Sequence, residues 1–173
     1  MSDDAKRRIF SMFDSDGDQV VSRSEYLSRV DRVAAALGVP AHAPAVAEAR
    51  RAHEAVWRDM DADQDGRLTF DDYRGWAGPA AFERTCRAVL GAMFDLADGD
   101  GDGYLGRAEF IRLRTAMGNP KAGAEKAFDD LDNDHDGLVQ RDDYLTAIRD
   151  FVVTGVSAIA PVYGTDVVLQ ESN

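Results

Sequence analysis

Four short stretches of this chain repeat one spacing of acidic residues, and this repeat restricts the fold more than any other feature. Each stretch places aspartate at the first, third and fifth positions of a run of twelve residues. Three carboxylates at this spacing face one point only if the backbone curls around it, and they repel one another unless a positive charge lies between them. A hard divalent cation with oxygen ligands is the expected occupant.

The four stretches also agree outside the aspartates. Position 12 is again an acid, and position 8 is always aliphatic. An aromatic residue stands four positions before each stretch (Phe10, Trp57, Phe94, Phe128), and another follows it directly (Tyr26, Tyr73, Phe110, Tyr144). These offsets predict a helix on each side of each loop. The pattern resembles the EF-hand, a helix–loop–helix calcium motif.

The loops differ in how closely they follow the strict motif, which has glycine at position 6 and glutamate at position 12. Only the third loop has both. The second and fourth loops keep Gly66 and Gly137 but end in aspartate, and the first ends in Glu25 but carries Gln19 at position 6. We expect Gln19 to adopt a positive φ at some cost in strain. Whether the first loop is occupied stays open.

The EF-hand resemblance implies ligands from positions 1, 3, 5 and 12 and from the backbone oxygen of position 7. These are Asp14, Asp16, Asp18, Val20 and Glu25; Asp61, Asp63, Asp65, Arg67 and Asp72; Asp98, Asp100, Asp102, Tyr104 and Glu109; and Asp132, Asp134, Asp136, Leu138 and Asp143. Because aspartate is one methylene shorter than glutamate, we expect the second and fourth sites to bind Ca²⁺ more weakly or to accept Mg²⁺ as well.

The charge of the chain is concentrated in these loops. The 32 acidic residues outnumber the 20 basic ones, and the loop ligands account for half of the acids. A net charge of −12 argues against a nucleic-acid partner. The sequence has no apolar run long enough for a membrane span and no secretory leader, so we expect a cytoplasmic protein. The single cysteine, Cys86, rules out an internal disulfide and is expected in the core.

Helices are predicted over residues 3–13, 23–37, 44–60, 70–77, 80–97, 107–117, 120–131 and 141–153. Pro44, Pro79 and Pro120 suit first helical positions, and Asn119 is the expected cap before the last of them. The Gly78–Pro79 step should break the chain so that its halves fold back on each other. We therefore predict an all-α fold with EF-hand pairs at 1–78 and 79–153 and an apolar tail, 154–173, packed on the core.

The arrangement resembles the sarcoplasmic calcium-binding protein group, and within it the bacterial calerythrin-like proteins, most closely at Tyr144–Phe151. This resemblance implies a monomeric calcium buffer without enzymatic activity or a membrane partner. Calerythrin-like proteins usually have one degenerate hand, whereas all four loops here keep their acids. The alternative is a calcium sensor that exposes an apolar groove to a protein target. A ligand-binding relative, as in the photoproteins, is a third class, which needs His, Trp and Tyr side chains around a cavity.

Overall fold

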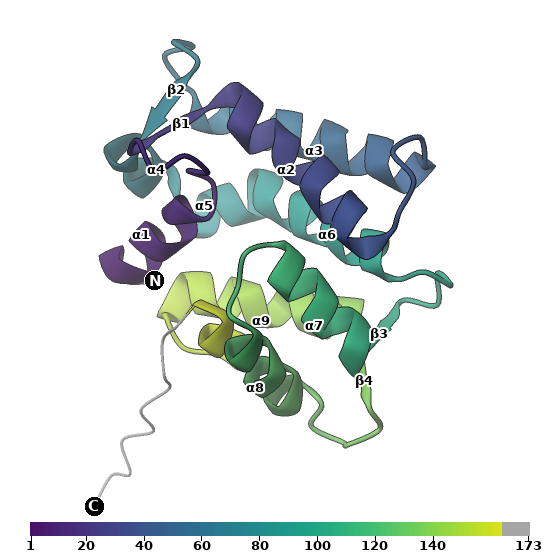
Figure 1. Cartoon of the computed structure of the whole chain (residues 1–173). Helices are drawn as coiled ribbons and strands as arrows, with labels where there is room; N and C mark the ends of the chain where they lie inside the picture. The colour runs from purple at the N-terminus through teal and green to yellow at the C-terminus, as the bar shows by residue number, and fades with distance from the viewer. Residues whose placement is uncertain (164–173) are drawn as a thin grey trace, which may run out of the picture.

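Four helix–loop–helix units follow one another in the computed structural model, which describes residues 1–163 (Figure 1). The helix before and the helix after each loop are α1 (Asp3–Ser11) and α2 (Arg23–Leu37), α3 (Pro44–Met60) and α4 (Phe70–Trp76), α6 (Arg87–Ala97) and α7 (Arg107–Ala116), and α8 (Lys121–Leu131) and α9 (Arg141–Thr154). The all-α, four-hand fold is therefore confirmed, and the predicted helix ends are correct to within one or two residues.

Short antiparallel strands join the loops in pairs. β1 (Val20–Ser22) pairs with β2 (Arg67–Thr69), and β3 (Tyr104–Gly106) pairs with β4 (Leu138–Gln140). The aliphatic position 8 of each loop is the central residue of its strand, so that Val21 lies opposite Leu68 and Leu105 opposite Val139. All four side chains are buried. Hands one and two, and hands three and four, are thus paired through their loops, as predicted.

The chain turns back between the two pairs at Gly78. α4 ends at Trp76, and Pro79 begins a new helical segment that runs through α5 (Pro79–Ala81), a π-helical turn (η1, Phe82–Cys86) and α6. The new segment packs against α2 and α3 of the first pair and against α7 and α9 of the second. Figure 1 shows α6 in the middle of the molecule, between the two pairs. None of the helices within residues 1–163 is long and apolar enough to cross a bilayer.

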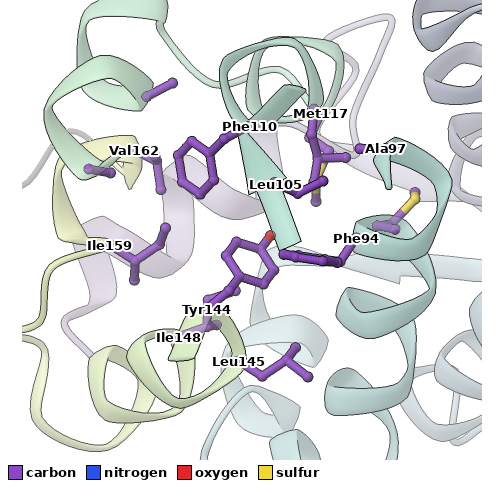
Figure 2. Packing of buried hydrophobic residues seen from close by; sticks show 14 of the residues in the cluster. Phe94, Ala97, Leu105, Phe110, Met117, Tyr144, Leu145, Ile148, Ile159 and Val162 are labelled. Atoms are coloured by element: carbon purple, nitrogen blue, oxygen red, sulfur yellow. The ribbon is translucent and has the colours of Figure 1, made fainter. Parts of the chain in front are cut away.

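The C-terminal pair has an aromatic core. The ring of Tyr144 packs tilted against Phe94 and edge-on against Phe110, with centroid distances of 5.5 and 6.0 Å (Figure 2). Leu105, from the central position of its strand, lies beside these rings in the same cluster. The aromatic residues that frame the loops therefore form the core on which the loops rest.

The residues after α9 also pack on the helices. Ile159 to Tyr163 are buried, and a short 3₁₀ turn (η2, Ala160–Tyr163) lies against α8 and α1. The ring of Tyr163 stacks on Phe151 at 4.8 Å, and Arg8 Nη1 donates to the Tyr163 carbonyl oxygen at 3.0 Å. The apolar Val167–Leu169, expected to pack in the same way, lie outside the described residues.

One predicted cap is wrong. α8 begins at Lys121 with Pro120 at its N-cap, and Asn119 does not cap it. Asn119 is buried instead, and its Nδ2 donates to the carbonyl oxygen of Val162 at 2.9 Å. This side chain links the start of α8 to η2. Pro44 and Pro79 occupy the first helical positions, as expected.

Candidate metal centres

The helix before each loop brings its last turn directly to position 1. The position 1 amide donates to the carbonyl oxygen of the aromatic residue four positions earlier, at 3.2, 2.9, 3.0 and 2.9 Å in loops one to four. These aromatic residues are Phe10, Trp57, Phe94 and Phe128, and all four are buried. Because each ring is anchored in the core, the first aspartate of each loop is held at a fixed place at the helix end.

Within each loop, backbone amides turn inward to the aspartates. The position 1 carboxylate accepts from the position 6 amide at 3.0, 3.2, 2.9 and 3.1 Å in loops one to four. The position 5 carboxylate accepts from the position 7 amide at 2.8, 2.8, 2.8 and 2.9 Å. The same bonds recur at each site, so the four loops share one backbone geometry.

This geometry gathers the carboxylates. In loops two, three and four the oxygens of positions 1, 3 and 5 lie within 4.8 Å of one another, and in loop one the close group is Asp14, Asp16 and Glu25. The three-aspartate clusters are Asp61, Asp63 and Asp65; Asp98, Asp100 and Asp102; and Asp132, Asp134 and Asp136. Asp18 lies outside the close group of the first loop, although its carboxylate also accepts from the Val20 amide.

The acids at position 12 hold the start of the next helix. Glu25 Oε2 accepts from the Ser22 amide at 2.9 Å and from its hydroxyl at 2.7 Å, and these hydrogen bonds lower the pKa of Glu25. Asp72 makes the same two bonds to Thr69, at 2.9 and 2.6 Å. Glu109 accepts from the Gly106 amide at 2.9 Å. Within residues 1–163, Asp143 makes no such bond to its loop.

Position 7 is the first residue of each short strand. Val20, Arg67, Tyr104 and Leu138 occupy it. Tyr104 and Leu138 expose 38% and 40% of their surface, which fits a position where only the backbone is required. The role of their carbonyl oxygens as ligands stays a prediction.

The donor set fits a divalent cation. Asp61 and Asp132 are only 8% exposed, and Asp61 Oδ1 is buried without any hydrogen-bond partner. A buried carboxylate oxygen without a partner is costly, and close like charges add to the cost. A bound cation would remove both penalties. The all-oxygen donors match Ca²⁺ or Mg²⁺ rather than a metal that prefers sulfur or nitrogen.

Two positions of each loop take the left-handed conformation. Gln19 at position 6 has φ 71°, as predicted, where the other loops have glycine. Position 4 is also left-handed, with Gly17 and Gly101 in two loops but Gln64 (φ 60°) and His135 (φ 58°) in the others. The sequence prediction missed this second position. Gly17 and Gly101 at position 4 of loops one and three could have indicated it, because glycine adopts a positive φ easily.

A family model describing an EF-hand domain pair matches residues 3–77 and 87–149. The chain therefore belongs to the EF-hand family of calcium-binding proteins. It is 29% identical to calerythrin of Saccharopolyspora erythraea, over 87% of this chain and 90% of calerythrin. It is 31% identical to a probable calcium-binding protein of Oryza sativa subsp. japonica, over 86% of this chain and 80% of the rice protein. The predicted resemblance to calerythrin-like proteins is confirmed.

Solved structures show the same fold. A calcium-binding protein of Streptomyces coelicolor, described for prokaryotic calcium-mediated regulation, superposes with a TM-score of 0.70 at 30% identity, covering 86% of this chain and 97% of that protein. Aequorin superposes with a TM-score of 0.77 at 22% identity, covering 94% of this chain and 91% of that chain. At this identity, the likeness to the photoprotein concerns the fold alone.

Proposed function

We propose that this calcium-binding protein is a monomeric cytoplasmic Ca²⁺ buffer or carrier with up to four EF-hand sites. The proposed ligands in each loop are the carboxylates of positions 1, 3, 5 and 12 and the backbone oxygen of position 7. The division into pairs at 1–78 and 79–153, with a tail at 154–173, belongs to the same proposal.

The burial of the apolar helix faces is the observation that carries the buffer role. A sensor needs an apolar groove, commonly rich in methionine, which opens on loading. Here Met60, Met93 and Met117 are buried, and Met12 packs against the core. The chain's own residues 159–163 cover part of the helical surface. Among residues 1–163, the large apolar side chains that stay exposed are Tyr104, Leu138, Val153 and Val156.

A titration with a neutral apolar dye, such as Nile red, tests the buffer role. The dye fluorescence is followed while Ca²⁺ is added, and calorimetry on the same sample gives the number of bound ions. A buffer binds several Ca²⁺ ions without a rise in fluorescence. A rise that follows Ca²⁺ binding would contradict the buffer role and favour a sensor.

The second candidate function is a calcium sensor. It is favoured by the likeness to the S. coelicolor protein, which is described in terms of calcium-mediated regulation. In a sensor, a movement of residues 159–163 away from α8 would expose the apolar surface that they cover. The dye titration distinguishes the two roles, because only a sensor exposes new apolar surface.

We also propose that the second and fourth sites select Ca²⁺ less strongly against Mg²⁺. A glutamate at position 12 supplies two oxygens to Ca²⁺, whereas Mg²⁺ needs six ligands in a tight octahedron. The side chains of Asp72 and Asp143 are one methylene shorter than glutamate, which favours coordination of the cation through a single oxygen.

The exchange of Asp and Glu at position 12 tests this selectivity. Asp72→Glu and Asp143→Glu should raise Ca²⁺ affinity at their sites by about tenfold and reduce competition by Mg²⁺. Glu25→Asp and Glu109→Asp should do the reverse at the other two sites. Calorimetric Ca²⁺ titrations with and without millimolar Mg²⁺ measure both effects. Equal Mg²⁺ competition in all variants would show that position 12 does not set the selectivity.

A further inference from the structure

A cavity lies at the centre of the molecule, among helices of both halves. Its volume is about 100 Å³, which is room for several water molecules or for the body of a small organic molecule. Its wall includes side chains of α1, α2, α3 and α4 from the first half and of α6, α7, α9 and η2 from the second. The predicted apolar face of the segment that begins at Pro79 borders it with Phe82, Cys86, Val89, Leu90 and Met93.

The wall of the cavity is apolar and aromatic, with two charged side chains. These are Arg29 from α2 and Arg114 from α7. Within residues 1–163, no aspartate or glutamate lines the cavity, although the chain has 32 acids and only 20 bases. The interior of a strongly acidic protein is therefore positively charged at this point.

Both arginines are buried, and neither has an acidic partner in the part of the chain that the structure describes. Arg29 is 8% exposed and Arg114 is 1% exposed. Arg29 Nη2 donates to the Met117 carbonyl oxygen at 3.1 Å, and Arg114 Nη1 donates to the Tyr144 hydroxyl at 2.7 Å. Neither pairs with a carboxylate of residues 1–163, and the Nε atom of each has no hydrogen-bond partner. A buried charge without a counter-ion is strongly unfavourable.

The two guanidinium groups lie close to one position in the fold. Both contact Met117, since Arg114 Nη1 also lies 3.9 Å from the Met117 sulfur. Aromatic rings pack against them, with Arg29 4.9 Å from the Phe13 centroid and Arg114 5.4 Å from that of Tyr163. Burial lowers the pKa of Arg29, and the charge of Arg114 is a smaller cause in the same direction. The aromatic contacts ease the burial of two cations but do not neutralise them.

Two more polar side chains of the cavity wall have a buried atom without a hydrogen-bond partner within residues 1–163. His53 Nδ1 is bonded to the Ala49 carbonyl at 2.8 Å, whereas its Nε2 is buried without a partner. Asn119 Oδ1 is buried and unpartnered in the same way. Four of the five such side-chain atoms found within residues 1–163 thus belong to this one cavity, and the fifth is the loop atom Asp61 Oδ1. Buried polar groups normally have partners, so their convergence here indicates a polar occupant.

We propose that the cavity is a binding site for a small organic acid, with an apolar or aromatic body and one carboxylate that pairs with Arg29 and Arg114. The apolar wall suits the body of such a molecule, and the arginines supply the counter-charge and the donors that a carboxylate accepts. A cation would be repelled, and a neutral molecule would leave both arginines unpaired.

Octanoate is the probe for the test, and octan-1-ol is the uncharged molecule of the same chain length. Both are titrated into the full chain in the presence of Ca²⁺ by calorimetry. Octanoate should bind once per chain and at least about tenfold more tightly than octan-1-ol. No binding of octanoate at millimolar concentration, or equal binding of the two probes, would overturn the proposal.

Two matched pairs of variants locate the site. Arg29→Met and Arg114→Met remove one cation each and keep an apolar stem, so the preference for octanoate should fall by about tenfold. Arg32→Met and Arg112→Met change exposed arginines on the same two helices, α2 and α7. These two variants should leave the preference for octanoate over octan-1-ol unchanged. Arg29→Lys and Arg114→Lys keep the charge and should retain most of the preference, with far-UV circular dichroism confirming the fold. A loss in the surface variants equal to that in the buried ones would place the binding elsewhere.

Discussion

Gln19 is the residue at which the first loop departs most clearly from its motif. Its φ of 71° lies in the region that glycine adopts easily and other residues adopt at a cost of about 1 kcal/mol or more. Since the position 6 and position 7 amides of this loop make the same hydrogen bonds as in the other three loops, the strain does not disrupt the backbone of the loop.

Replacement of Gln19 by glycine should therefore tighten the first site. Removal of the strain corresponds to a gain of up to about tenfold in Ca²⁺ affinity, measured by calorimetric titration. Gln64→Gly, at the left-handed position 4 of the second loop, should show a gain of the same kind. Ala62→Gly serves as the control, because Ala62 is not left-handed and glycine should give no gain there. A gain with Ala62→Gly alone would contradict the strain argument.

His53 makes stability depend on pH. Burial, and secondarily the charge of Arg29, lowers the pKa of His53 to about 4. Histidine in an unfolded chain titrates near about 6.5, so the unfolded state takes up a proton first as the pH falls. The neutral, buried His53 thus contributes about 3 kcal/mol to the free energy of unfolding above about pH 6.5, and this contribution is lost as the pH falls to about 4.

Urea unfolding of the metal-free protein between about pH 7 and pH 4 measures this dependence. His53→Gln is the comparison, because it keeps a polar side chain but cannot take up the proton. Titration of the loop carboxylates is common to both proteins and cancels in the difference. If wild type and variant lost stability in parallel, His53 would not be the titrating group.

At the scale of single residues, the sequence predicts the aspartate clusters of loops two to four well and the buried polar residues poorly. The Asp spacing alone places Asp98, Asp100 and Asp102 within one cluster, because local backbone geometry determines their separation. Arg29 and Arg114 could not be recognised in the same way. Each lies in a helix with exposed arginines nearby, and only contacts with distant elements show which of them are buried.

Among the elements, α8 and η2 approach each other closely at Gly123. A Cβ atom at Gly123 of α8 would overlap the Pro161 carbonyl oxygen and lie 3.0 Å from the Pro161 carbonyl carbon. Both atoms belong to the backbone, so neither can turn away. Only glycine at this position allows the residues after α9 to lie against α8.

Gly123→Ala should consequently destabilise the protein by about 1–3 kcal/mol, although alanine usually stabilises a helix interior by about 0.5–1 kcal/mol. Gly91→Ala in α6 is the matched control. A Cβ atom there meets only the Arg141 side chain, which is flexible and can move aside. Thermal unfolding of both variants measures the difference. Gly123→Ala at least as stable as Gly91→Ala would show that η2 does not depend on the close approach.

The helices themselves were predictable because glycine and proline mark their ends. Gly38 ends α2 in the left-handed conformation, and Pro44 begins α3. The π-helical turn Phe82–Cys86 was not predicted, since its residues have no local signal that separates it from an α-helix. The role of Asn119 was also missed, because its partner Val162 is 43 residues away in the chain.

For the whole molecule, the acid clusters should make stability depend on bound metal. Without a cation, the carboxylates of each loop repel one another, and Asp61 Oδ1 stays buried without a partner. A ligand at a hundred times its dissociation constant stabilises the folded state by about 2.7 kcal/mol, against a total domain stability of about 5–15 kcal/mol.

The loaded protein should thus melt far above the metal-free protein. Thermal unfolding in excess Ca²⁺ and in a calcium chelator, at equal ionic strength, measures the difference. Mg²⁺ in place of Ca²⁺ should give an intermediate melting temperature. Coincident curves in Ca²⁺ and chelator would show that the loops do not hold Ca²⁺ in the folded state.

The sequence also predicts how the hands combine. The aliphatic residue at position 8 indicates paired loops, and Gly78–Pro79 indicates that the halves fold back on each other. The central cavity could not be predicted, because its wall is assembled from helices of both halves. Cys86 is an example: the sequence predicts a core position, whereas the residue is partly buried and borders the cavity. Burial raises the pKa of its thiol to about 12.

The hydrogen bond from Arg29 to the Met117 carbonyl has one more consequence. Arg29 belongs to the helix that leaves the first loop, and Met117 directly follows the helix that leaves the third. A rotation of one helix upon ion binding would therefore change the packing of the other, although Arg29 and Met117 are 88 residues apart in the chain. A molecule bound between these helices would therefore be coupled to calcium binding. By thermodynamic reciprocity, it would change the calcium affinity by the same factor by which calcium changes the affinity for that molecule.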